Sequence, residues 1–298
     1  MSEWGKVLGL LHDKGKETDA FQQYIKKESG YAPDIKICGK HHHAYVGGIL
    51  AQKYYGKSSY NLFVNQIVSH HTGLHDSDEI KGIVDQEIPS EVNIYHKKEK
   101  LNRPGLNVQA NDFHHLARML FSCLVDADYL DTEAFLDKES SALRQNKDAL
   151  NDLLPLLENK LKDLKAKADS SEINIIRNQI QQQCLKMADT PTGFYSLTVP
   201  TGGGKTLSSL VWAIKHALKN GQKRVIIAIP YTSIIVQTAS VLRSIFGEEN
   251  VLEHHSCVDP EQIKDEKLKE KMKLATENWD YPIIVTTNVQ LFVSMFSN

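Results

Sequence analysis

The clearest structural signal in this sequence is a glycine-rich segment, Pro200-Thr201-Gly202-Gly203-Gly204-Lys205-Thr206. It lies between a short β-like stretch, residues 195–199, and an apolar-periodic helix that reaches about Asn220. Two further apolar stretches at 225–229 and 283–287 read as buried strands, and a helical pattern follows the first of them from about Ser233 to Ile245. Strands that alternate with helices predict a parallel α/β sheet with crossover helices in this half of the chain.

The same segment predicts a phosphate-binding loop. Glycines allow the backbone N–H groups to turn inward around phosphate oxygens, and the following helix adds its positive end. We expect Lys205 to reach the β- and γ-phosphates of ATP and Thr206 to hold Mg²⁺. The strict pattern needs a glycine at position 199, where this chain has valine. The alternative is a glycine-rich turn with an incidental lysine. The predicted nucleotide-binding residues are Thr201, Gly202, Gly203, Gly204, Lys205 and Thr206.

Nothing in the chain before about residue 190 reads as a strand, and most of it reads as helical. Apolar residues recur at helical spacing in 3–27, 43–56, 59–71, 111–135 and 139–169, whereas 73–110 is polar and rich in turn residues. Pro155 predicts a kink or a new helix start inside the last of these stretches. A length of 298 residues suits about two domains. We therefore expect an all-α domain over 1–170 and a partial α/β domain over 171–298, with the border between residues 165 and 190.

Charge and composition exclude several classes of protein. The formal net charge is −2, so no global positive field points to nucleic acid, and contact with it would need a local patch. No apolar run approaches the ~20 residues that span a bilayer, and the N-terminus lacks a secretory layout. The four cysteines are scattered, without a CxxC pair. These features predict a reduced, cytoplasmic protein with no membrane partner.

Histidines are concentrated near the N-terminus, with ten of the thirteen in the first 115 residues. They occur in ordered groups on successive predicted helices, which favours a metal site over isolated surface histidines. Nitrogen and oxygen ligands without thiolates suit Mn²⁺, Fe²⁺, Co²⁺, Ni²⁺ or Mg²⁺. The groups are His12-Asp13, His41-His42-His43, His70-His71 and a later acidic stretch, Asp126-Ala127-Asp128.

These motifs resemble two known families in succession. The His-Asp step before Lys-Gly-Lys, the His-x-x-x-Gly segment from His43 to Gly47 and the His-His-x-Gly segment at 70–73 resemble the HD metal-dependent phosphohydrolases. Pro-Thr-Gly-x-Gly-Lys-Thr resembles the phosphate loop of superfamily 2 helicases, and 227–233 with Gln237 and 285–290 resemble their next motifs. In this order, the motifs resemble the CRISPR-associated nuclease–helicases of type I interference systems.

The resemblance implies a fold, a reaction and partners. An α-helical HD nuclease domain would precede a partial RecA-like helicase domain, and the chain would cut single-stranded DNA delivered by a CRISPR RNA-guided surveillance complex. Asp13 would bridge two divalent ions; His43, His70 and His71 would hold one, and His12 and Asp128 the other. Lys16, one turn after His12-Asp13, would contact a phosphate; a solvent-exposed lysine is the alternative. Two ions together would activate a water and neutralise charge on the scissile phosphate.

Several alternatives stay open at this stage. The family's first metal-binding histidine lies upstream of its HD pair, but none of the 11 residues before His12 is histidine. Either the chain is truncated there, or one site is short of a ligand, for which His41 or His42 is a substitute. Helical periodicity by itself does not favour Asp128 over Asp126 or Asp131.

The helicase part also departs from its family. We find no Asp-Glu pair at the end of an apolar strand after the phosphate loop, and such a pair aligns the water for ATP hydrolysis. We therefore expect a chain truncated at both ends that binds ATP with Mg²⁺ but has no helicase activity alone. The competing functions are an HD hydrolase of small phosphates and an inactive docking module.

Overall fold

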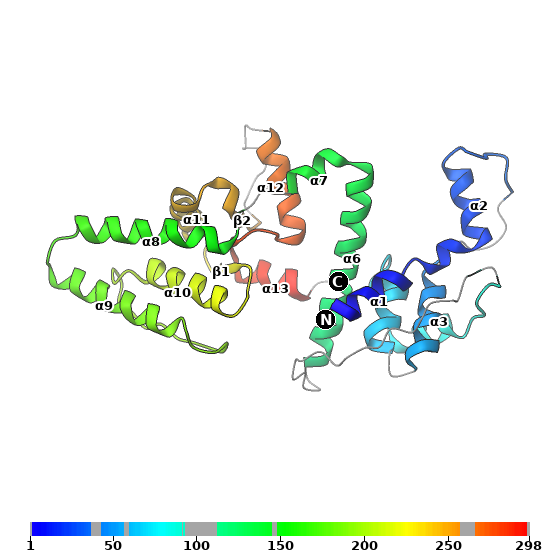
Figure 1. Ribbon diagram of the computed structural model, residues 1–298, viewed down its shortest axis with the longest axis horizontal. Helices are drawn as coiled ribbons and strands as arrows, with labels where there is room; N and C mark the ends of the chain where they lie inside the picture. Colours follow the sequence, from blue (N-terminus) through cyan, green and yellow to red (C-terminus); the bar gives the residue numbers. More distant parts are fainter. Residues whose placement is uncertain are drawn as a thin grey trace. The chain divides into compact units, whose positions relative to one another are not determined.

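The computed structural model describes residues 2–36, 43–56, 60–90, 92, 112–144, 148–256 and 266–296. The chain divides into two compact units, Met1–Leu136 and Asp137–Ser297 (Figure 1). Among the described residues, none of the helices combines the length and apolar character needed to cross a lipid bilayer.

All the regular secondary structure in the described residues of the first unit is helical. Its core is built by helices whose apolar residues fall on one side; in α1, Trp4, Val7, Leu8 and Leu11 are buried at helical spacing. Leu50, Ile67 and Ile80 are fully buried beside them. The elements are α1 (Ser2–Leu11), a 3-10 turn (Lys14–Glu17), α2 (Asp19–Glu28), α3 (Ala44–Tyr55), a π-helical turn (Tyr60–Val64), α4 (Asn65–Ser69), α5 (Ser77–Val84) and α6 (Phe113–Leu136).

The second unit contains a parallel three-stranded sheet in the order β1-β3-β2. Val225 of β1 and Val251 of β2 both pair with Ile283 of β3. The central strand β3 is buried over most of its length, as expected for a parallel strand covered on both faces. The strands are β1 (Val225–Ile229), β2 (Val251–His254) and β3 (Ile283–Thr287).

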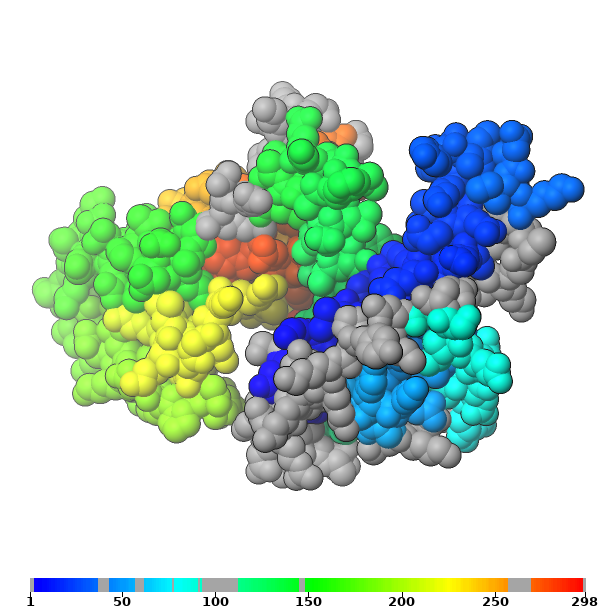
Figure 2. Space-filling model, turned by 45° about the vertical axis from the view of Figure 1, so that its right-hand side comes forward, coloured from blue at the N-terminus to red at the C-terminus, as the bar shows by residue number. Residues whose placement is uncertain are grey.

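Helices cover the sheet and extend away from it. Helix α10 packs against both α8 and α9 (Figures 1 and 2). Leu153 and Leu157 of α8, Ile214 of α10 and Ile235 of α11 are fully buried in one core with Ile283. The helices are α7 (Lys138–Arg144), α8 (Leu150–Lys167), α9 (Glu172–Met187), α10 (Lys205–Lys219), α11 (Thr232–Phe246), α12 (Glu266–Asn278) and α13 (Asn288–Phe296), with a 3-10 turn at Glu248–Asn250.

The structure confirms the expected α/β pattern in part. Strands at 225–229 and 283–287 and the helix between them are confirmed. The expected strand at 195–199 is wrong: these residues form no ladder with any described strand, and residues 195–198 are exposed. A strand is defined by its hydrogen-bonded neighbours, and no described strand of the sheet supplies one. Pro155 lies inside α8, so the new helix starts earlier, at Leu150.

The limits of the compact units differ from the expected domain border at residues 165–190. Leu150, Leu153 and Leu157 of α8 are part of the core beneath the sheet, so the helices from α7 onward belong to the second unit. Residues 172–187 form the continuous helix α9. The assignment of one activity to 1–170 and another to 171–298 remains a prediction.

Candidate metal centre and phosphate loop

His12 and Asp13 lie directly after the end of α1. The Nδ1 of His12 donates a hydrogen bond to the carbonyl oxygen of Gly9 at 2.9 Å, which leaves Nε2 as the ring atom with a free lone pair. That Nε2 lies 3.4 Å from Oδ2 of Asp13 and 3.5 Å from Oδ1 of Asp128 on α6. A backbone bond that fixes the tautomer and aims the other nitrogen is typical of metal-binding histidines.

Two glycines allow the backbones on either side of this site to touch. A Cβ atom on Gly15 would lie 2.0 Å from the carbonyl oxygen of His43, and one on Gly47 would lie 1.9 Å from the carbonyl oxygen of Leu11. Neither distance is compatible with a side chain, so the end of α1 and the start of α3 approach each other only because both positions are glycine. This close approach brings His43 beside Asp13, with Nε2 3.2 Å from Oδ1.

His70 and His71 follow the end of α4. The Nδ1 of His70 donates to the carbonyl oxygen of Ile67 at 2.6 Å, so its Nε2 also carries a lone pair. Within the described part of the chain, this buried Nε2 and the buried Oδ1 of Asp13 have no hydrogen-bond partner, although they lie 3.8 Å apart. The Nε2 atoms of His71 and His43 are 3.2 Å apart. Buried acceptors that face one another without a proton between them fit a shared cation.

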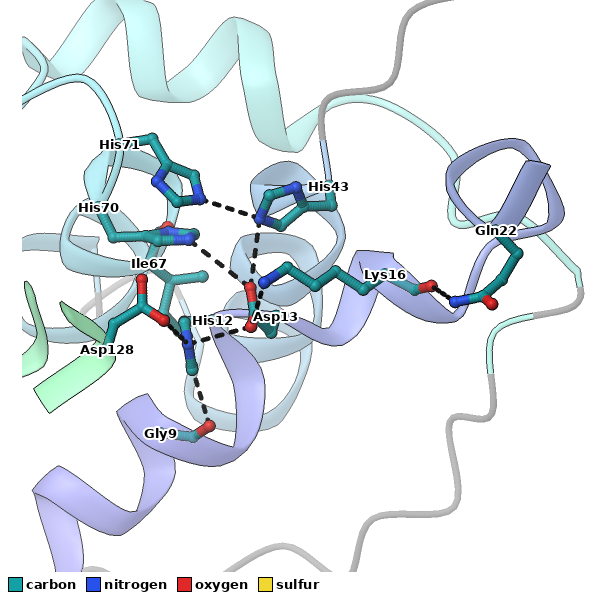
Figure 3. A network of polar contacts seen from close by, with 10 residues as sticks. All are labelled: Gly9, His12, Asp13, Lys16, Gln22, His43, Ile67, His70, His71 and Asp128. Atoms are coloured by element: carbon teal, nitrogen blue, oxygen red, sulfur yellow. Dashed lines mark hydrogen bonds and ion pairs between the residues drawn. The ribbon is translucent and has the colours of Figure 1, made fainter. Parts of the chain in front are cut away.

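All six expected ligands are brought together, in two groups. Asp13, His43, His70 and His71 form one, and His12, Asp13 and Asp128 form the other; in each group the ligand atoms lie within 4.8 Å of one another. Figure 3 shows the imidazole rings and both carboxylates pointing toward a common centre. Asp126 and Asp131, which periodicity had left open, are exposed and belong to neither group. His41 and His42 lie outside the described residues.

The protonation states suit a divalent metal. Burial alone raises the pKa of Asp13, but contacts with His43 and Lys16 and the charge of His12 outweigh it and hold the pKa well below its ordinary value. Burial lowers the pKa of His70 from 6.5 to about 4, helped by the neighbouring His71. Burial, and then the neighbouring His43, also lowers the pKa of His71. At neutral pH, Asp13 is therefore ionised and these two rings are neutral, as metal binding requires.

Lys16 contacts the site directly. Its Nζ donates a hydrogen bond to Oδ2 of Asp13 at 2.6 Å (Figure 3). Sequence reasoning had expected a phosphate for this ammonium; in the structure its partner is the carboxylate that both ligand groups share.

The glycine-rich loop has the geometry of a phosphate cradle. Gly202 and Gly204 adopt positive φ angles of 83° and 77°, and α10 begins at Lys205 immediately after them. A Cβ on Gly203 would lie 2.4 Å from Cγ1 of Val199, so any other residue here would force the Val199 side chain to move. Residues 200–202 and 204–207 line a pocket, and the side chains of Lys205 and Thr206 are exposed. The open end of a helix beside this pocket attracts an anion.

One residue at this loop was missed by sequence reasoning. Arg177 of α9 donates from Nε to the carbonyl oxygen of Gly202 at 2.9 Å and from a guanidinium nitrogen to Oδ1 of Asn174. It therefore braces the loop from outside. The contact joins residues 25 positions apart, and no sequence motif around Arg177 predicts it.

The two expected helicase segments lie at the carboxyl ends of neighbouring strands. Thr232 begins α11 three residues after the last residue of β1. Thr287 closes β3, and its Oγ1 accepts a hydrogen bond from the backbone N–H of Gln290 at 2.9 Å at the start of α13. Because β1 and β3 are parallel neighbours, both segments emerge at one edge of the sheet, where ligands of open α/β folds bind.

Comparison with known proteins identifies this part of the chain. Residues 178–298 match the family model described as DEAD/DEAH box helicase. The matched range contains the phosphate loop and all three strands. The match agrees with the expected superfamily 2 helicase module with a RecA-like fold. It includes none of the residues of the two ligand groups. No curated protein matches the chain.

Proposed function

We propose that residues 1–136 form a two-metal phosphodiesterase site that cuts single-stranded DNA, joined to a helicase module that binds ATP. The observation that carries this proposal is the pair of ligand groups with Asp13 common to both. A carboxylate with one oxygen in each group is suited to bridge two ions. Mn²⁺, Fe²⁺, Co²⁺, Ni²⁺ and Mg²⁺ all accept these nitrogen and oxygen donors.

The chain's own residues would set up this chemistry. His43, His70 and His71 with Oδ1 of Asp13 would hold one ion, and His12 and Asp128 with Oδ2 of Asp13 the other. Bound ions supply a water of lowered pKa and neutralise charge on the scissile phosphate. The Gly9 and Ile67 carbonyls keep His12 and His70 in the tautomer that presents Nε2. No side-chain nucleophile is required of the protein.

The helicase module supports a polymeric nucleic acid as the substrate. A small-phosphate hydrolase of the HD type has no need of a helicase domain, whereas a nuclease that works on a strand fed to it does. Thr201–Gly204 would cradle the phosphates of ATP, Lys205 would pair with the β- and γ-phosphates, and Thr206 would bind Mg²⁺. The succession of an HD-like site and a DEAD/DEAH box helicase domain supports a role in CRISPR interference, with an RNA-guided surveillance complex as partner.

Cleavage of circular single-stranded DNA tests the proposal. The protein is stripped with chelator, and Mn²⁺, Ni²⁺, Co²⁺ or Mg²⁺ is added back to the wild type and to His12→Ala, Asp13→Ala and Lys205→Ala. We expect metal-dependent cutting that both ligand substitutions abolish and Lys205→Ala leaves unchanged. His114→Ala, an exposed histidine on α6 outside both groups, is the matched control. Absence of cutting with every metal, or cutting that survives Asp13→Ala, overturns the nuclease; release of phosphate from nucleotides alone favours a small-phosphate hydrolase.

A further inference from the structure

The two ligand groups are unequal. The first offers four residues, and the side chain of His70 within it is completely inaccessible to solvent, while that of His43 is 10% exposed. The second offers three residues, and the side chains of Asp13 and Asp128 are 31% and 20% exposed. His71 is exposed and Asp13 belongs to both groups, so the groups differ chiefly in the number of ligands. The site with more ligands holds an ion more tightly, so we expect the first group to be the stronger of the two.

A cation of the protein already contacts the second group. The Nζ of Lys16 lies 2.6 Å from Oδ2 of Asp13, and this same oxygen faces Nε2 of His12 at 3.4 Å. The first group's oxygen, Oδ1, has no hydrogen-bond partner among the described residues, and it faces Nε2 of His43 at 3.2 Å and Nε2 of His70 at 3.8 Å. The ammonium therefore neutralises the oxygen that belongs to the second group, whereas the other oxygen faces the histidines of the first group.

The backbone holds Lys16 in this place. The 3-10 turn begins with a hydrogen bond from the Lys16 N–H to the Asp13 carbonyl oxygen at 2.8 Å, which turns the lysine side chain back over Asp13. Its own carbonyl oxygen accepts from Nε2 of Gln22 at 2.8 Å. The neighbouring Lys14 pairs with Glu17 instead. The turn therefore holds the Lys16 side chain against the Asp13 carboxylate.

We propose that the Lys16 ammonium competes with the second metal ion for Oδ2 of Asp13, so that the two metal positions fill in sequence. This inference rests on the proposed metal site. The first ion enters the His43–His70–His71 group without displacing any charge. The second must first remove an ammonium that donates to its bridging ligand and repels it. Once displaced, the ammonium is available for a phosphate oxygen of the substrate.

Metal titration tests this without using activity. Calorimetry with Mn²⁺ on the metal-free full chain counts ions and gives both affinities, and electron paramagnetic resonance detects spin coupling between two neighbouring Mn²⁺ ions. For the wild type we expect one tight ion and a second that binds more weakly. Lys16→Met should strengthen the second step by about tenfold or more and leave the first unchanged, since a hydrogen bond to a charged group is worth about 1.5–3 kcal/mol. Coupled Mn²⁺ pairs should then form at lower metal concentration.

Two further variants control for charge and folding. Lys26→Met removes one positive charge from an exposed position on α2 and should bind both ions as the wild type does. Lys16→Gln should behave as Lys16→Met, and agreement between them excludes local misfolding in one variant. A second step as weak in both Lys16 variants as in the wild type overturns the competition. Failure of every protein to bind even one ion overturns the metal site itself, which is a separate result.

Discussion

Gly47→Ala is the sharpest probe of the candidate metal centre. The added Cβ would lie 1.9 Å from the carbonyl oxygen of Leu11, and the obstacle is backbone rather than a mobile side chain. An ordinary contact needs about 3.4 Å or more, so α1 and α3 must separate by roughly 1.5 Å. We expect a cost of about 1–3 kcal/mol in the stability of the first unit, the usual range for overpacking.

The same displacement should reach the metal ligands. His12 and Asp13 directly follow Leu11, and His43 precedes α3 by one residue, so a separation of roughly 1.5 Å between the helices moves the candidate ligands apart. Metal ligands tolerate deviations of only about 0.2 Å, so metal affinity should fall together with stability. If the structure around position 47 relaxed without moving these residues, neither metal affinity nor stability would fall.

Gly5→Ala provides a matched control in α1. No atom lies within 4 Å of its added Cβ, and the position is exposed, so alanine should stabilise the helix by about 0.5–1 kcal/mol. Hydrogen exchange read by mass spectrometry on peptides from α1 and α3 reports the local stability of this unit, and calorimetry with Mn²⁺ reports the ligands. If Gly47→Ala matches Gly5→Ala in both measurements, the close approach of the two backbones is not what positions the site.

Three further predictions follow from named contacts. The pKa of His70 is lowered to about 4 in the folded protein, so between pH 6.5 and 4 the unfolded state binds a proton that the folded state does not. The free energy of unfolding of the metal-free first unit should therefore fall by up to about 3 kcal/mol as the pH falls through this window. Urea titrations should show a smaller decrease for His70→Gln. Arg177→Met removes the hydrogen bond to the Gly202 carbonyl and should weaken binding of a fluorescent ATP analogue about fivefold, whereas Lys205→Ala should abolish binding. Unchanged affinity in Arg177→Met would mean that this hydrogen bond does not help the loop to bind ATP. Asp128→Asn should weaken the second Mn²⁺ by about tenfold or more while Asp126→Asn has no effect, and equal losses in both would exclude Asp128 as the ligand.

Most of the helices and two of the three strands could be predicted because their signals are local, whereas α5 was missed in a stretch read as turn-rich and α9 was missed at the expected domain border. The buried spacing of Trp4, Val7, Leu8 and Leu11 lies within eight consecutive residues, and β3 begins with three consecutive β-branched apolar residues. The strand β2 was missed because Val251–His254 is short and half polar. Its burial comes from pairing with β3 and from the contact of Glu253 with Arg243, neither of which is visible within four residues.

The ligand set of the metal centre was within reach of the sequence, but its geometry was not. The order of the His and Asp groups indicated the motifs, and the six individual residues, Asp128 among them, came from the resemblance to the HD family. The structural reason is the position of α6 relative to α1, which points Asp128 at Nε2 of His12. The periodicity of α6 identifies the apolar side of the helix. A metal ligand can lie at the edge of that side, where helical spacing does not distinguish one aspartate from another.

The glycines show most directly why part of the site escapes sequence reasoning. Gly47 served only as a motif letter four residues after His43, and Gly15 only as a helix break. In the structure each is the place where one backbone presses on another, Gly47 on Leu11 and Gly15 on His43. These two contacts join the segment around His12 and Asp13 to the segment around His43, although the segments lie about 30 positions apart in the sequence. The pairing of Lys16 with Asp13 depends on the same turn. Short motifs can therefore name the candidate ligands. The distances between these ligands depend on backbone contacts that form only where a glycine has no side chain in the way.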